Sequence, residues 1–115
     1  MVTRKESLRL LQQRTEGLHT FDFYLFLPTK MAAQATAAMV RWRDVTKEVM
    51  PGAKRGSWLV LISKVMYPDA SKLELMELIF RYITRKHGGY YGGWEVDIHK
   101  PELDGLTGLV FRRDA

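Results

Sequence analysis

Two pairs of adjacent glycines, Gly88-Gly89 and Gly92-Gly93, lie close together in the C-terminal part of this 115-residue chain. Glycine adopts positive φ without a steric penalty, so the first pair can end a helix. The second pair can seat a β-bulge or a turn where the chain enters its next strand. From Trp94 to His99, apolar and polar residues alternate as they do in a strand with two different faces. This stretch therefore predicts a helix that is followed closely by a strand.

Three earlier segments also have the composition of strands. Residues 19–27 alternate between two faces and are rich in aromatic side chains. Residues 46–50 predict a short edge strand, and residues 57–67 contain a nearly continuous apolar run that suits a central strand. Near the C-terminus, residues 109–111 are apolar, which is enough for one further short strand or a docked extension.

Two long helices and one short helix are predicted between and before these strands. Thr29 is a suitable N-cap for a helix that extends to about Asp44, and Asp69 or Ser71 can start a helix that reaches the first glycine pair. An amphipathic helix is expected over residues 3–13. The side chains that we expect to face the sheet are Met31, Ala35, Ala38, Met39 and Trp42 in the first long helix and Leu73, Met76, Ile79, Phe80 and Ile83 in the second.

The order of elements predicts a ferredoxin-like βαββαβ sandwich of the α+β class. Right-handed crossovers place both long helices on one face of a four-stranded antiparallel sheet. The expected spatial order is fourth strand, first, third, second. We accordingly divide the chain into an N-terminal helical extension (1–17), a ferredoxin-like domain (18–100) and a C-terminal extension (101–115).

Composition limits the chemistry that such a domain can perform. The chain has no cysteine, which excludes disulfides, zinc–thiolate sites and cysteine catalysis and fits a reducing compartment. No apolar run approaches the ~20 residues of a membrane span, and residues 1–17 lack a signal-peptide core. We therefore expect a cytoplasmic protein without membrane association. The formal charge of +5 permits an acidic partner or nucleic acid, but many proteins with such a charge bind neither.

The alternation along the first and last strands predicts two different sheet faces. The residues expected to face the helices are Phe21, Phe23, Leu25, Trp94, Val96 and Ile98. The residues expected on the open face are Asp22, Tyr24, Phe26, Glu95, Asp97 and His99. Apolar surface from Tyr24 and Phe26 on that face usually marks a partner or a dimer contact.

Catalytic, metal and cofactor sites are not expected. His19 and Asp22 would lie near Asp97 and His99, a combination that can bind metal or move protons, but the spacing matches no metal motif. The glycine pairs are not a phosphate loop, because a strand follows them and no lysine-serine or lysine-threonine pair does.

Direct nucleic-acid binding is also disfavoured. The third strand lacks the aromatic pattern of RNA-binding ferredoxin-like domains, and the carboxylates expected on the open face would repel phosphates. Arg41 and Arg43 beside Trp42 form a dense basic spot, which is the best candidate on the helices for docking an acidic partner.

The segment Tyr91-Gly92-Gly93-Trp94 after a helix, together with the order of elements, resembles the family of protein regulators of ribonuclease E activity, type B. In that family a helix leads into a Tyr-Asp-Gly-Trp segment that begins the last strand. The strand that ends at Pro28 is similar too, as is the strand from Trp58 towards Pro68. This chain departs from the family in two ways, since Gly92 replaces the aspartate and the acidic C-terminal tail of the best-known members is missing.

The resemblance implies a non-enzymatic, ferredoxin-like domain that binds a protein, in the best-studied case a component of the RNA-degrading machinery. We expect the protein contacts at Tyr24, Phe26, Tyr90, Tyr91, Gly93 and Trp94. The open face is also a candidate homodimer contact. Two alternatives stay open: a small dimeric ferredoxin-like enzyme with a pocket that reaches Asp97 or His99, and a nucleic-acid-binding module whose affinity falls steeply with salt.

Overall fold

The computed structural model describes residues 17–98 and 109–113. Within them the chain forms, in order, β1 (His19–Leu27), α2 (Lys30–Met39), β2 (Val45–Pro51), β3 (Trp58–Met66), α3 (Ala70–Lys86), β4 (Tyr90–Ile98) and β5 (Leu109–Arg113). The helix expected over residues 3–13 lies outside the described residues.

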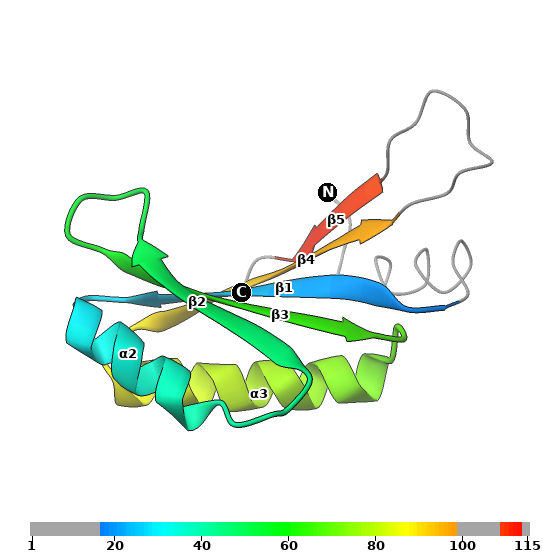
Figure 1. Cartoon of the computed structure of the whole chain (residues 1–115), viewed down its shortest axis with the longest axis horizontal. Helices are drawn as coiled ribbons and strands as arrows, with labels where there is room; N and C mark the ends of the chain where they lie inside the picture. The colour runs from blue at the N-terminus through cyan, green and yellow to red at the C-terminus, as the bar shows by residue number, and fades with distance from the viewer. Residues whose placement is uncertain (1–16, 99–108, 114–115) are drawn as a thin grey trace.

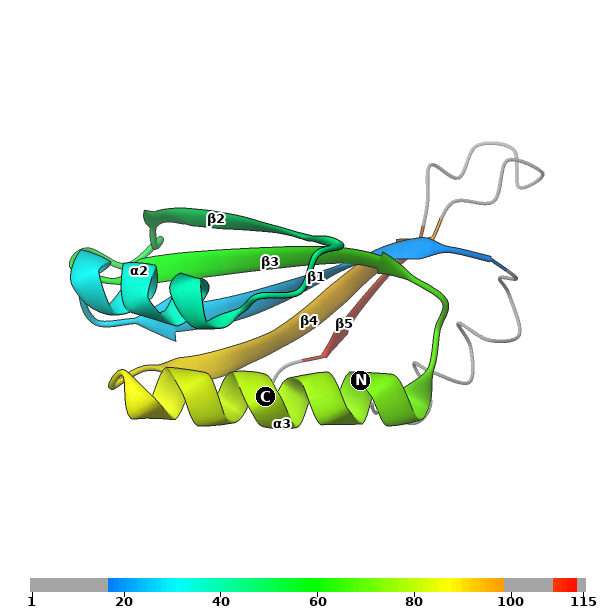
Figure 2. The ribbon, with the colours of Figure 1, turned by 60° about the horizontal axis from the view of Figure 1, so that its bottom comes forward.

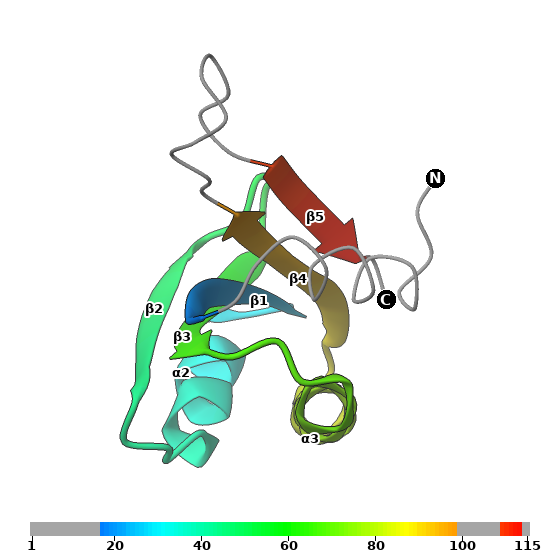
Figure 3. The same cartoon turned by 90° about the vertical axis from the view of Figure 1, so that its right-hand side faces the viewer.

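The described strands form one antiparallel sheet in the order β2-β3-β1-β4-β5 (Figure 1). The predicted order of the first four strands is therefore confirmed, and β5 adds a strand beyond β4. Both helices lie on the same side of the sheet (Figure 2). Figure 3, a view along α3, shows that no described helix covers the opposite side. The fold is the expected ferredoxin-like α+β sandwich, extended by one strand.

The core lies between the sheet and the two helices, and β1 supplies much of it. Phe21, Phe23, Leu25 and Leu27 are buried, while the residues between them are partly exposed. The ring of Phe23 packs on Phe80 of α3 with centroids 5.0 Å apart, and Phe21 meets Trp94 edge-on at 5.5 Å. The predicted inward-facing residues of β1 and β4 are thus confirmed up to Val96.

Helix α2 differs from the prediction in both its length and its buried face. Thr29 caps it as expected, accepting a hydrogen bond from the amide of Ala32 at 3.0 Å, but the helix ends at Met39 and not near Asp44. Its buried residues are Ala33 and Thr36. The predicted inward stripe is wrong for Met31 and Met39, which are 79% and 40% exposed, and for Ala38, which is also exposed.

Lys47 on β2 helps to explain where α2 ends. Its ammonium donates to the carbonyls of Ala37 at 2.9 Å and Val40 at 2.7 Å, at the helix end where the Ala37 carbonyl also accepts from the Val40 amide. Trp42 follows this end and packs edge-on against Phe80 with centroids 5.5 Å apart. Trp42 therefore joins the core from a loop, and this placement depends on contacts distant in the sequence.

Helix α3 starts at the Asp69 cap, one of the two predicted positions, and ends at the first glycine pair. Gly88 has φ +80°, the amide of Gly89 donates to the carbonyl of Thr84 at 2.8 Å, and the amide of Gly88 donates to Arg85 at 3.2 Å. These two bonds form the Schellman motif that ends many helices. The predicted helix stop is confirmed. The predicted residues Leu73, Met76, Phe80 and Ile83 are buried, and Ile79 is partly buried.

The second glycine pair forms the predicted β-bulge. Tyr24 of β1 pairs with Gly93 of β4, whereas the next residue, Leu25, pairs with Tyr91, so Gly92 is the additional residue. Gly93 has φ +107°. A side chain at Gly92 would collide with the ring of Phe26, because an added Cβ would lie 2.3 Å from that ring.

A buried lysine on β3 is held by a carboxylate on the helix side of the sheet. Lys64 is 6% exposed, and its ammonium forms an ion pair with Asp44 in the loop after α2. The hydrogen bond from Lys64 lowers the pKa of Asp44 below its ordinary value of 3.8. Because a lysine is rarely buried without a partner, Asp44 allows Lys64 to occupy a core position.

Alanine substitutions should separate the backbone role of the glycines from their packing. Gly88→Ala and Gly56→Ala should each lower the free energy of unfolding by roughly 1–2 kcal/mol, because alanine is strained at positive φ. Gly89→Ala should cost more, since its Cβ would lie 2.0 Å from the Phe26 carbonyl oxygen. Urea unfolding followed by circular dichroism measures all three. A Gly89→Ala loss no larger than the other two would contradict this packing.

Acid should reveal the ion pair between Lys64 and Asp44. Asp44→Asn should lower the melting temperature at neutral pH, because it leaves a buried ammonium without its carboxylate. A carboxyl whose pKa is lower in the folded state stabilises the protein above its unfolded pKa, and this stabilisation is lost as the pH falls through the folded pKa. The melting-temperature difference between wild type and variant should therefore shrink as the pH falls below the ordinary aspartate pKa of 3.8. A difference that is constant over a pH series would refute this role.

Candidate functional site

The sheet face opposite the helices carries an apolar surface made by β1 and β3. Along β1 this face presents Asp22, Tyr24 and Phe26, all partly exposed. Their register partners on β3 are Ser63, Leu61 and Leu59, in that order. Residues directly opposite each other in an antiparallel pair share a face, so these six side chains adjoin. Val65 continues the surface and is 53% exposed.

The carboxylates on this face are tied to neighbouring hydroxyls. The Tyr24 hydroxyl donates to the Glu95 carboxylate on β4, and the Ser63 hydroxyl donates to Asp22 at 2.6 Å. Glu48 of β2 faces the same way, because it pairs with Leu61. Among the described side chains of β1 to β4, this face carries no lysine or arginine, although the whole chain has a formal charge of +5. The part of the open face formed by β1 to β4 is therefore apolar and acidic, and at its edge Arg112 of β5 is in register with Glu95.

The most exposed aromatic residue of this surface is Tyr90, the first residue of β4. Its side chain is 65% exposed and stacks on Phe26, with ring centroids 5.1 Å apart and an interplanar angle of 22°. Gly92 lies against the Phe26 ring, and a side chain at this position would collide with the ring. We call Phe26, Tyr90 and Gly92 the aromatic corner. Tyr24 extends it along β1, so that three of the expected contact residues, Tyr24, Phe26 and Tyr90, lie together.

The expected roles of Tyr91 and Trp94 as surface contacts must be corrected. Tyr91 is 4% exposed and Trp94 1%, and both point towards the helices. The Arg81 guanidinium lies over the Tyr91 ring, 5.3 Å from its centroid. Residues three apart in a regular strand face opposite sides, but the bulge at Gly92 turns both rings to the same side. Gly93, the sixth expected contact, contributes backbone at positive φ.

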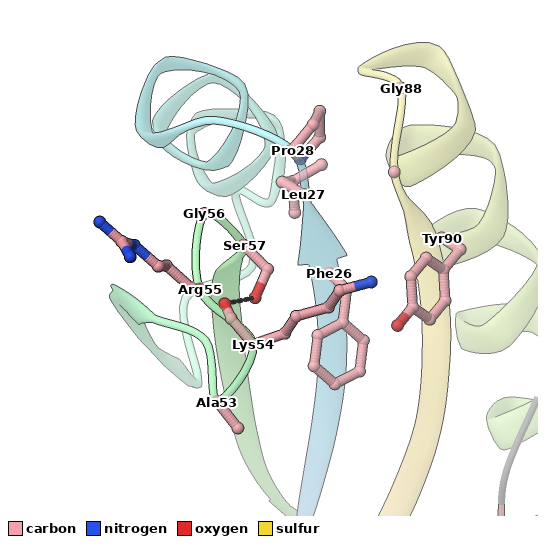
Figure 4. Close-up of a pocket in the computed structure, with 11 residues that line it drawn as sticks. Phe26, Leu27, Pro28, Ala53, Lys54, Arg55, Gly56, Ser57, Gly88 and Tyr90 are labelled. Carbon is pink, nitrogen blue, oxygen red and sulfur yellow. Dashed lines mark hydrogen bonds between the residues drawn. The ribbon is translucent and has the colours of Figure 1, made fainter.

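A cavity opens beside the aromatic corner. It lies where the end of β1, the loop between β2 and β3 and the turn between α3 and β4 meet, and its volume is about 460 Å³. Lys54 reaches across Phe26 towards Tyr90, whereas Arg55 points away from both rings (Figure 4). The sequence shows residues 53–56 only as a basic turn. Lys54 lies near the start of β4 because of the order of the strands in the sheet. The pattern of residues around Lys54 does not reveal this order.

His19 and Asp22, two of the residues considered for a metal or acid–base site, lie on opposite faces of the sheet. Along β1, His19 pairs with buried Met66 and so faces the helices, while Asp22 lies on the open face. Partial burial lowers the pKa of His19 from its ordinary value of 6.5. The side chains of Asp97 and His99 lie outside the described part. Within that part, no group of three or more histidine, aspartate or glutamate residues could hold a metal.

The basic spot expected around Trp42 lies in the loop after α2. Arg41 and Arg43 are exposed, whereas Trp42 between them is partly buried against the core, so the basic spot offers charge without an aromatic anchor.

In the described part of the chain, no helix is long and apolar enough to cross a membrane.

Comparison with known proteins identifies the family of this chain. A family model described as Regulator of ribonuclease activity B matches residues 6–96, which include β1 to β3, both helices and most of β4. Searches of curated proteins and of solved structures found no match. The family match covers more than half of the chain and agrees with the resemblance seen in Tyr91-Gly92-Gly93-Trp94. The chain therefore belongs to the family of regulators of ribonuclease activity B.

Proposed function

We propose that this protein is a non-enzymatic regulator that binds an endoribonuclease of the ribonuclease E type in the cytoplasm and changes its activity. The family supports a ribonuclease as the target. The observation that carries the binding site is the aromatic surface of Tyr24, Phe26 and Tyr90 on the side of the sheet that no described helix covers. Aromatic residues dominate the energetics of protein interfaces, and such a surface is seldom left to water.

The charges on this face indicate the chemistry of the partner. Asp22 and Glu48 lie among apolar side chains on this face, and the side chains described on β1 to β4 include no lysine or arginine there. A ribonuclease segment that carries apolar side chains flanked by lysine or arginine would match this arrangement. The same carboxylates disfavour RNA along the strands, because they repel phosphates.

An enzymatic function lacks comparable support. The cavity beside the aromatic corner is lined by no carboxylate and no histidine, and Lys54 and Arg55 are its charged residues. Such a lining suits binding better than proton transfer, because the groups that most often serve as general acids and bases are missing from it.

Two equally exposed tyrosines provide a matched test of the site. Tyr90→Ala removes the outer ring of the aromatic corner, and Tyr82→Ala removes a ring of similar exposure (63% against 65%) from α3. Binding of the purified ribonuclease E of the source organism, measured by calorimetry, should weaken about tenfold or more for Tyr90→Ala. It should change less than about twofold for Tyr82→Ala.

The same samples test the regulatory role. Addition of the wild-type protein should change the rate at which the ribonuclease cleaves a defined RNA, and Tyr90→Ala should shift the concentration needed. Absence of binding by the wild type would refute the proposed function. Equal losses for the two tyrosine variants would refute the assignment of the site while leaving the function intact.

A further inference from the structure

The cavity beside the aromatic corner has defined walls, because hydrogen bonds hold the backbone of each wall in place. The loop that carries Lys54 is closed by Ser57, whose amide and hydroxyl both donate to the Lys54 carbonyl, at 3.0 Å and 2.5 Å. The opposite wall is the Schellman turn at Gly88 and Gly89. The backbone that carries the lysine is therefore held in a tight turn, which reduces the backbone entropy lost when a ligand is bound.

The charge of this cavity is opposite to that of the described side chains that β1, β2 and β3 present on the open face. Its lining contains Lys54 and Arg55 but no carboxylate, and in the described part of the chain neither residue forms an ion pair. Arg55 points away from the rings, so Lys54 is the cation that faces Phe26 and Tyr90 (Figure 4). The nearby Lys30 lies over the Trp58 ring, 5.6 Å from its centroid. The cavity thus offers one ammonium group beside an aromatic wall.

The donors of the cavity fit a carboxylate better than a phosphate. Phosphate sites gather several N–H donors, commonly backbone amides of a glycine-rich turn. Here the amides of Gly88 and Gly89 already donate to the carbonyls of Arg85 and Thr84, and the Ser57 hydroxyl donates within its own loop. One ammonium beside a stacked pair of rings suits a single carboxylate that is attached to an apolar group.

We propose that this cavity binds an aspartate or glutamate of the partner protein, next to an apolar side chain that packs on Phe26 and Tyr90. This inference rests on the proposed function, since it assigns the chemistry of one end of the same binding surface. The acidic residue of the partner pairs with Lys54, and basic residues further along the same segment meet Asp22 and Glu48. Two opposite charges at the two ends of the surface give the bound segment a defined direction.

Capped peptides test the cavity without the ribonuclease. The isotope-labelled full chain is titrated with Ac-Gly-Phe-Glu-Gly-NH2 and with Ac-Gly-Phe-Gln-Gly-NH2, and backbone amide shifts are followed by NMR. The glutamate peptide should shift amides of residues 53–57 and 88–90 and bind about tenfold more tightly than the glutamine peptide. Equal affinities, or the absence of shifts at these residues, would overturn the proposal.

Adjacent cations supply the control variants. Lys54→Ala should abolish the preference for the glutamate peptide, while Arg55→Ala, which removes the same charge from the next residue, should keep it. Equal effects of the two variants would show only general electrostatic attraction and would refute the site. A short uridine oligonucleotide that shifts these amides when the peptides do not would assign the cavity to nucleic acid instead.

A measurement on the ribonuclease separates this inference from the proposed function. Lys54→Ala should weaken ribonuclease binding about tenfold, and Arg55→Ala should not. If Lys54→Ala binds the ribonuclease as tightly as the wild type does, while Tyr90→Ala binds it more weakly, the assignment of the cavity is refuted and the proposed function is not.

Discussion

Strand β1 is the constraint on which the other elements depend. It is hydrogen-bonded on one side to β3 and on the other to β4, so its register fixes both neighbours. Its inward residues form the centre of the core, and its outward residues form the middle of the proposed binding surface. A shift of one residue would exchange these two sets. The stability of the core and the composition of the open face are therefore coupled through one alternating sequence.

The bulge in β4 modifies this coupling at one end of the sheet. By inserting Gly92 it sends Tyr91 and Trp94 into the core and leaves Tyr90 outside, stacked on Phe26. The aromatic corner is thus a product of backbone geometry as much as of residue type. It adjoins the Lys54 loop on one side and the acidic strands on the other, so apolar, basic and acidic groups follow one another along a single face.

Much of the fold could be predicted from local patterns, and the failures share a physical cause. Alternation in residues 19–27 and the two glycine pairs predicted β1, the helix stop and the bulge, because those features depend on neighbouring residues. The buried face of α2 could not be predicted, since an alanine-rich helix presents small side chains on several sides and its end is met by Lys47 from the following strand. The positions of Tyr91, Lys54 and Lys64 depend likewise on register, loop placement and a partner carboxylate.

The contact between Gly92 and Phe26 has a consequence for the diversity of the family. Where the family pattern has aspartate, a Cβ would stand 2.3 Å from the Phe26 ring in this backbone, so that ring would have to move. An aspartate at this position would therefore require Phe26 to leave the place that it occupies in the stacked corner. The glycine of the bulge thus sets the shape of the exposed aromatic platform, so that exchange of this one residue would remodel the platform while the architecture beneath stays the same.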